Sequence, residues 1–211
     1  MAALALLTGA GPARAETLLH LSATATVTVQ PDELAASLSA DADEATPQAA
    51  QARVNAAITA ALATARAVEG ASVSTGSYSV WHVEQPHPAW QASQGISLHG
   101  ADGGAILALV GRLQTQGLAV ASLGWRVSAP AERRAHEEAE REAIAALRGR
   151  AAAAAKLLGL RFQEFRSVDL DPGSRPLPMG RMMAAAVPMP NAVASPVAIS
   201  ATVTAEAALA P

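Results

Sequence analysis

The sequence predicts an α+β protein with a largely antiparallel sheet and three helices packed on one face, in the order ββαββαβαββ. Several runs alternate apolar and polar residues, which is the period of a half-buried strand. Three other segments repeat apolar residues at helical spacing, and each ends in a glycine: Gly70, Gly117 and Gly159. Paired strands separated by single helices favour antiparallel pairing with the helices in one layer.

The chain opens with two predicted strands. From Leu19 to Gln30 every second residue is apolar and the residues between them are polar. Pro31 and Asp32 then form a turn signal, and residues 34–42 alternate again. We therefore expect the two strands to pair as an antiparallel hairpin, with one face toward the core and one toward water.

Two helices and three strands are expected in the middle of the chain. The first helix starts at Thr46, a capping residue, and ends at Gly70. The second helix opens at Asp102 and ends at Gly117. Strands fill the intervals between and after these helices, at residues 73–83, 90–98 and 119–127.

The longest helix is predicted from Pro130 to Gly159. Proline suits the first turn of a helix, and glycine suits the position just past its end. The second half of this helix carries an apolar stripe that should lie on the sheet, formed by Ile144, Leu147, Ala151, Ala154 and Leu158. A strand at 162–170 follows, and an alternating strand at 197–207 is expected to return to the sheet beside an earlier strand.

Length and composition predict a single domain over residues 16–211. Apolar residues make up 51% of the chain, but many are alanines, so the core needs close backbone approach. Aromatic residues make up only 3%, and we expect them to anchor the core: Tyr78, Trp81, Trp90, Trp125, Phe162 and Phe165. The net charge of −3 gives no reason to expect a nucleic acid or an anionic membrane surface as a partner.

Residues 1–15 are predicted to be an export signal. Residues 2–7 form a short apolar segment, and the Ala-Arg-Ala sequence before Glu16 fits the small-x-small cleavage pattern. No positive charge precedes the apolar segment, so a frayed N-terminal tail is the alternative. The chain has no cysteine and no apolar run long enough for a membrane span, which is compatible with a periplasmic protein.

Residues 171–196 are predicted to form a long flexible arm, because they are rich in proline and small residues and show neither the helical nor the strand period of apolar residues. Four of the five methionines of the chain lie there: Met179, Met182, Met183 and Met189. Thioether sulfur is a soft ligand for Cu(I), so the arm could hold copper. We favour the alternative, an adaptable apolar arm that packs against another subunit, because the spacing of the methionines is irregular.

Four stretches of the sequence resemble the SIMPL domain family, formerly domain of unknown function 541. They are the opening strand with its Pro-Asp turn at 22–32, the strand at 75–80, the strand that starts at Trp90, and the helix that ends at Gly159. The resemblance implies an exported bacterial α+β protein of the periplasm or the outer-membrane fraction. It also implies assembly, because some relatives form large ring-like oligomers, and it carries over no catalytic residue.

The histidines of the chain are candidate zinc ligands. His82, His87 and His99, with Glu84 between the first two, are residue types that bind zinc. Their spacing matches no zinc site, and alternation along a strand would separate the side chains. Exposed loop histidines are therefore the preferred interpretation.

No other motif predicts chemistry. Thr75-Gly76-Ser77 lacks the second glycine and the following helix of a nucleophile elbow. Asp102, followed by two glycines, is interpreted as a helix cap. The remaining acidic clusters are interpreted as solvated charge at strand ends: Asp41, Asp43, Glu44, Asp169 and Asp171.

The sequence therefore predicts no catalytic, cofactor-binding or metal-binding residue, and a function that is not enzymatic. We expect a structural or interaction module of the cell envelope that forms homo-oligomers and contacts an envelope protein partner. Nucleic acid and a membrane span are not expected. A periplasmic Cu(I)-binding protein that uses the arm at 171–196 is the alternative.

Overall fold

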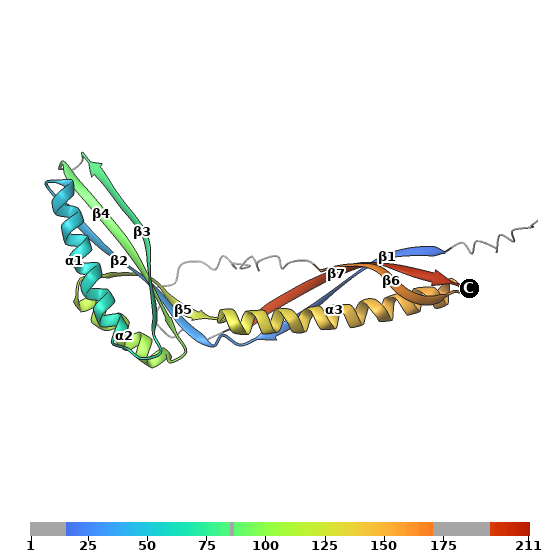
Figure 1. Ribbon diagram of the computed structural model, residues 1–211. Coiled ribbons are helices and arrows are strands. Elements are labelled where there is room, and N and C mark those ends of the chain that lie inside the picture. The colour runs from blue at the N-terminus through green and yellow to red at the C-terminus, as the bar shows by residue number, and fades with distance from the viewer. Residues whose placement is uncertain (1–15, 85–86, 171–194) are drawn as a thin grey trace, which may run out of the picture. The chain divides into compact units, whose positions relative to one another are not determined.

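The computed structural model describes residues 16–84, 87–170 and 195–211. Within these ranges the elements are β1 (Thr17–Val29), β2 (Glu33–Glu44), α1 (Pro47–Arg66), β3 (Ser72–Val83), β4 (Ala89–Gly100), α2 (Gly103–Thr115), β5 (Ala119–Arg126), α3 (Ala129–Leu157), β6 (Arg161–Leu170) and β7 (Val197–Ala210). The chain divides into two compact units. The first unit contains β1, α3 from Arg133 onward, β6 and β7, and the second contains β2 to β5 with α1 and α2 (Figure 1).

The predicted α+β class, the antiparallel pairing and the order ββαββαβαββ are confirmed. α2 and α3 end two residues before Gly117 and Gly159, and α1 ends four residues before Gly70. The three glycines have φ angles of 93°, 70° and 75°, respectively. The strands are divided between two sheets, one in each unit, rather than joined in one sheet. The division into two units does not decide whether residues 16–211 form a single domain, so the single domain stays a prediction.

The expected hairpin between β1 and β2 is wrong. β1 pairs with β7, whereas β2 pairs with β4 and β5, so the two consecutive strands enter different sheets. The carboxylate of the predicted turn residue Asp32 accepts hydrogen bonds from the backbone N–H of Ser128 at 2.6 Å and from the Ser128 hydroxyl at 2.7 Å. Asp32 therefore binds the residue that precedes α3 instead of closing a hairpin.

The second unit is a four-stranded antiparallel sheet in the order β3-β4-β2-β5, with α1 and α2 packed on one face (Figure 1). Thr46 caps α1 by accepting the N–H of Ala49 at 3.3 Å, and Asp102 caps α2 by accepting the N–H of Ala105 at 3.0 Å. The core between the layers is aliphatic, and its larger side chains are Leu34, Leu38, Val54, Ile58, Ile96, Leu98, Ile106, Leu109, Val110, Leu113 and Leu118.

The middle of the sheet face opposite α1 and α2 is built from small side chains, and larger polar residues lie toward its ends: Glu33, Asp41, His99 and Arg126. One row of paired serines crosses all four strands: Ser74, Ser97, Ser37 and Ser122. Small residues flank this row along the strands, among them Ala35, Ser39, Gly95 and Gly124. Because successive side chains of a strand point to opposite faces, the row points away from the buried Ala36 and Leu38. We call these eight residues the serine face.

The first unit is a three-stranded sheet in the order β1-β7-β6, with α3 along one face (Figure 1). β7 lies in the middle and is antiparallel to β6. The hydroxyl of Thr24 lies 2.9 Å from that of Thr202, and the hydroxyl of Thr26 lies 2.8 Å from that of Ser200, so β1 is also antiparallel to β7. The prediction that the last strand returns beside an earlier strand is confirmed.

The helix α3 faces its sheet with small side chains. Within the first unit its buried residues recur every four positions: Ala135, Ala139, Ala143, Leu147, Ala151 and Ala155. The predicted stripe is right for Leu147 and Ala151 but wrong for Leu158, which is 58% exposed. The alanines allow close contact between the helix and the sheet, where they meet Ala23 and Ala205.

The aromatic side chains do not anchor the core as expected. Three of them are 38–43% exposed: Tyr78, Trp81 and Trp125. Trp90 is partly buried against the core of the second unit, and Phe165 is partly buried against that of the first. Layers lined with alanine leave little room for rings, so leucine, isoleucine and valine fill the interior.

Candidate functional site

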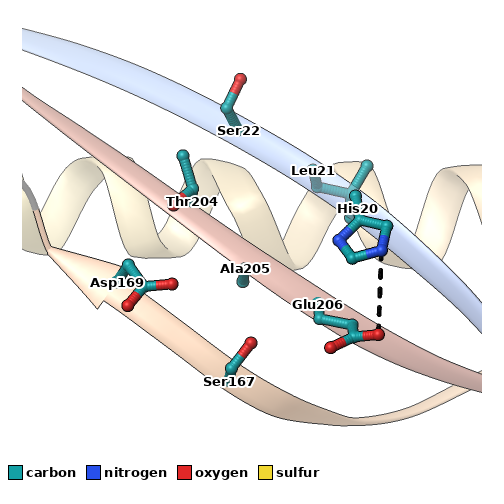
Figure 2. Close-up of a pocket in the computed structure, with 8 residues that line it drawn as sticks. All are labelled: His20, Leu21, Ser22, Ser167, Asp169, Thr204, Ala205 and Glu206. Carbon is teal, nitrogen blue, oxygen red and sulfur yellow. Dashed lines mark ion pairs between the residues drawn. The ribbon is translucent and has the colours of Figure 1, made fainter.

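The open face of the three-stranded sheet contains a polar hollow with a volume of about 350 Å³. Figure 2 shows its lining residues along three neighbouring strands: His20, Leu21 and Ser22 of β1, Thr204, Ala205 and Glu206 of β7, and Ser167 and Asp169 of β6. We call it the His20 hollow. Its polar side chains face away from α3, because Leu21 and Ala205 alternate with them and pack toward the helix.

His20 and Glu206 face each other across β1 and β7 (Figure 2). Nε2 of His20 lies 3.8 Å from Oε1 of Glu206, which is an ion pair when the imidazole is protonated. The histidine side chain is 81% exposed and the glutamate side chain 26% exposed. A pair this open to water contributes little to stability, because solvent and salt screen it.

The His20 hollow can bind polar groups, but it is not arranged for acyl transfer. A serine nucleophile needs a base within about 2.6–3.2 Å. Among the described residues, no hydrogen bond joins His20 to any of the three hydroxyl groups of the hollow. The carboxylates of Asp169 and Glu206 beside these hydroxyls suit a ligand that donates hydrogen bonds, such as an amine or a polyol.

A second polar hollow, of about 310 Å³, lies in the second unit. Its lining residues are Glu33, His99, Arg126, Val127, Ala129, Pro130 and Glu132. Nε of Arg126 donates to Oε1 of Glu33 at 2.6 Å, and the side chain of Glu33 is only 12% exposed. This contact pairs the guanidinium with one carboxylate, so the second carboxylate of the lining, that of Glu132, leaves the hollow with a net negative charge.

The candidate zinc residues are dispersed over the sheet of the second unit. At one end of β4 the ring of His82 contacts that of Trp90, with centroids 5.0 Å apart. His99 lies near the other end of β4, in the second hollow. His87 and Glu84 are exposed between β3 and β4. In residues 16–84, 87–170 and 195–211, no group of three or more histidine, cysteine, aspartate or glutamate residues could hold a metal ion.

The acidic candidates and the serine motif have local roles. Oε1 of Glu44 pairs with Arg53 at 3.0 Å, and Oδ2 of Asp41 accepts the Ser39 hydroxyl at 2.8 Å. Asp102 caps α2, as predicted. Residues 75–77 lie inside the strand β3, not in a strand-to-helix turn.

The proposed copper ligands and one acidic candidate lie outside the described residues: Met179, Met182, Met183, Met189 and Asp171. The predicted export signal at 1–15 and most of the predicted arm at 171–196 also lie outside them. In the part of the chain that the structure describes, no helix combines the length and the hydrophobicity that a membrane crossing requires.

Comparison with known families identifies this chain's family. A family profile described as SIMPL, protein of unknown function (DUF541), matches residues 19–207. The chain belongs to the SIMPL family. The match runs from β1 into β7 and therefore includes elements of both units of this SIMPL protein. None of the curated proteins matches the chain.

SIMPL membership confirms the family resemblance but assigns no reaction, because the family description gives no function. The His20 hollow of this SIMPL protein is not predicted by its sequence. Its lining comes from residues 20–22, 167–169 and 204–206, which become neighbours only through the pairing of β7 with β1 and β6. The alternating polar positions of these strands are visible in the sequence, but they do not indicate which strands are adjacent.

Proposed function

We propose that this SIMPL protein is a non-catalytic, exported module of the cell envelope that acts by self-assembly and by contact with envelope proteins. The observation that carries the proposal is the serine face. Its side chains are no larger than that of serine, and its row of four serines crosses the whole sheet. Such a surface lets a second sheet approach to less than the roughly 10 Å at which ordinary sheets stack.

A second copy of the chain suits this surface. A two-fold axis would place one serine row against the other, and each hydroxyl both donates and accepts a hydrogen bond. Identical surfaces can therefore satisfy each other without complementary charges. The eight residues of the serine face are uncharged. Glu33, Asp41 and Arg126 border them on the same side of the sheet, and Glu33 and Arg126 already pair with each other.

Sedimentation velocity over a range of protein concentrations tests the assembly. We expect oligomers for the wild type and loss of oligomers for Ser97→Arg, because the long cationic side chain would hold the two faces apart. Ala60→Arg is the matched control, since Ala60 is exposed on α1, on the other side of the same sheet. A wild-type monomer at every concentration would exclude assembly, and oligomers of Ser97→Arg would exclude the serine face as the contact.

Export is part of the same proposal and is supported by the sequence of residues 1–15. Osmotic-shock fractionation with mass determination of the protein tests it. We expect a chain that begins at Glu16 in the periplasmic fraction. A chain that keeps residues 1–15 and stays in the cytosolic fraction would contradict export.

Binding of Cu(I) is the second candidate function, supported by the cluster of four of the five methionines at residues 179–189. Titration with Cu(I) under reducing conditions tests it. Replacement of both Met182 and Met183 by leucine should lower the stoichiometry, because leucine keeps the volume but has no sulfur. An unchanged stoichiometry would eliminate a copper site in the arm.

A further inference from the structure

The C-terminal end of α3 exposes two consecutive leucines. Leu157 is 88% exposed and Leu158 is 58% exposed. The helix ends in an ordered turn, since the N–H of Leu160 donates to the carbonyl of Ala155 at 2.8 Å and Gly159 has a φ of 70°. This hydrogen-bonded cap holds both leucines at the surface. We call Lys156, Leu157, Leu158 and Arg161 the α3 tip.

The charged residues that lie near these leucines in the sequence are all cationic. Residues 143–163 contain four charged side chains and no acidic one: Arg148, Arg150, Lys156 and Arg161. The acidic residues of α3 all precede this stretch: Glu132, Glu137, Glu138, Glu140 and Glu142. The net charge of −3 for the whole chain therefore conceals a positive end of the helix.

Two carboxylates of the first unit, those of Glu16 and Glu164, are already engaged by another cation. Nη2 of Arg166 lies 2.5 Å from Glu16 and its Nη1 lies 2.8 Å from Glu164. The hydrogen bond and the charge of Glu16, followed by the charge of Glu164, raise the pKa of Arg166. In the described residues Lys156 and Arg161 form no ion pair, so their charges stay available to a partner.

We propose that the α3 tip docks on the surface of an anionic lipid bilayer. Exposed leucines enter the boundary between headgroups and acyl chains, while lysine and arginine extend their charged ends to the phosphates. The tip combines both features within six residues, from Lys156 to Arg161. Docking of this kind needs no membrane-spanning helix and does not depend on the serine face.

A second copy of the chain is the competing occupant of the α3 tip. A two-fold contact between two tips would bring Lys156 and Arg161 of each copy toward the same cations of the other copy. Like charges brought together in an interface disfavour association. An anionic bilayer offers the opposite charge together with an apolar layer, so it fits the tip better.

Flotation of the full chain with lipid vesicles tests the proposal. We expect binding to phosphatidylcholine vesicles that contain phosphatidylglycerol, no binding to pure phosphatidylcholine, and weaker binding as salt is added. Lys156→Gln and Arg161→Gln should each weaken binding about fivefold, because each removes one cation near the surface. The double variant Leu157→Ser/Leu158→Ser should lose binding.

Matched controls lie on α2 of the second unit. Leu107 is 51% exposed and Arg112 is exposed, so Leu107→Ser and Arg112→Gln remove a leucine and a cation away from the tip. Both should bind vesicles like the wild type. Equal binding of the wild type to both vesicle types, or unchanged binding of the leucine double variant, would overturn the proposal.

Two further measurements keep the test decisive. Thermal unfolding followed by circular dichroism shows whether each variant folds. If the leucine double variant does not fold, the two glutamine variants still test the proposal. Sedimentation of the same variants shows whether the α3 tip binds a second copy of the chain instead of a bilayer. If the wild type fails to float and the tip substitutions abolish an oligomer, the tip is a contact between copies and lipid docking is wrong.

Discussion

The carboxylate of Asp32 holds Ser128 by both of its oxygens, although 96 residues separate the two. Oδ1 accepts the backbone N–H of Ser128 and Oδ2 accepts its hydroxyl. The same hydroxyl accepts the N–H of Ala131 at 3.3 Å in the first turn of α3. The N–H of Asp32 donates to the carbonyl of Arg126 at 3.1 Å. Through these hydrogen bonds Asp32 connects the segment between β1 and β2 to the start of α3.

Removing this contact should destabilise the protein measurably. We expect Asp32→Ala to lower the free energy of unfolding by about 1–3 kcal/mol, because it leaves two donors of Ser128 without their acceptor. Ser128→Ala should cost about 1–2 kcal/mol through loss of the helix cap. In urea denaturation the two effects should be non-additive by more than about 0.5 kcal/mol. The exposed Asp43 supplies the control Asp43→Ala, and strictly additive effects of Asp32 and Ser128 would contradict the coupling.

Leu147 is the largest side chain that α3 buries completely against the three-stranded sheet. Leu147→Ala should lower the free energy of unfolding by about 2–5 kcal/mol, because it removes apolar contact and leaves a cavity. Leu107→Ala, at a residue 51% exposed, should change it by less than about 0.5 kcal/mol. Urea denaturation of both variants checks the difference, and equal effects would show that α3 does not pack as described.

The alanines of α3 should tolerate enlargement only on the solvent side. Ala143 is completely buried, so Ala143→Leu should destabilise by about 1–3 kcal/mol through overpacking against the sheet. Ala146 is exposed on the same helix, and Ala146→Leu should be nearly neutral. Thermal unfolding of the pair provides the measurement. A neutral Ala143→Leu would mean that the helix lies farther from its sheet.

Two glycines of α2 should respond to alanine in opposite directions. A Cβ at Gly103 would lie 2.8 Å from Cη2 of Trp125, so Gly103→Ala must displace the indole ring and lower stability. A Cβ at Gly111 would meet nothing within 4 Å. Gly111→Ala should therefore raise stability by about 0.5–1 kcal/mol, because alanine favours a helix interior. Thermal unfolding with tryptophan emission checks both, and stabilisation by both substitutions would contradict the contact.

Local periodicity predicts the individual elements well. The strand expected at 34–42 is Glu33–Glu44, and the strand expected at 119–127 is Ala119–Arg126. Periodicity succeeds because it depends on which side chains share a face, and the face is set within a few residues of chain.

Strand neighbours cannot be read in the same way. β1 and β2 alternate equally well, and Pro31 with Asp32 forms a good turn signal, yet the two strands enter different sheets. Asp32 instead accepts hydrogen bonds from Ser128, which belongs to a distant part of the chain. Alternation carries no information about such a contact.

The same limit applies to the sites. Glu206 meets His20 because β7 lies beside β1, so the His20 hollow follows from pairing and not from a motif. Leu158 belongs by apolarity to the predicted stripe of α3, but the buried side of the helix consists mainly of alanines. Apolarity alone does not distinguish a leucine in a core from one offered to a partner.

The central place of β7 in its sheet sets an order of events for a newly made chain. The strands of the second unit all lie between residues 33 and 126, so they can associate early in synthesis. β1 and β6 border only β7 within their sheet, and the contact of Thr24 with Thr202 spans 178 residues. Loops of this length delay closure. A chain released before Val197 would therefore carry two strands with no neighbour, each open to capture by a chaperone or by another unfinished chain.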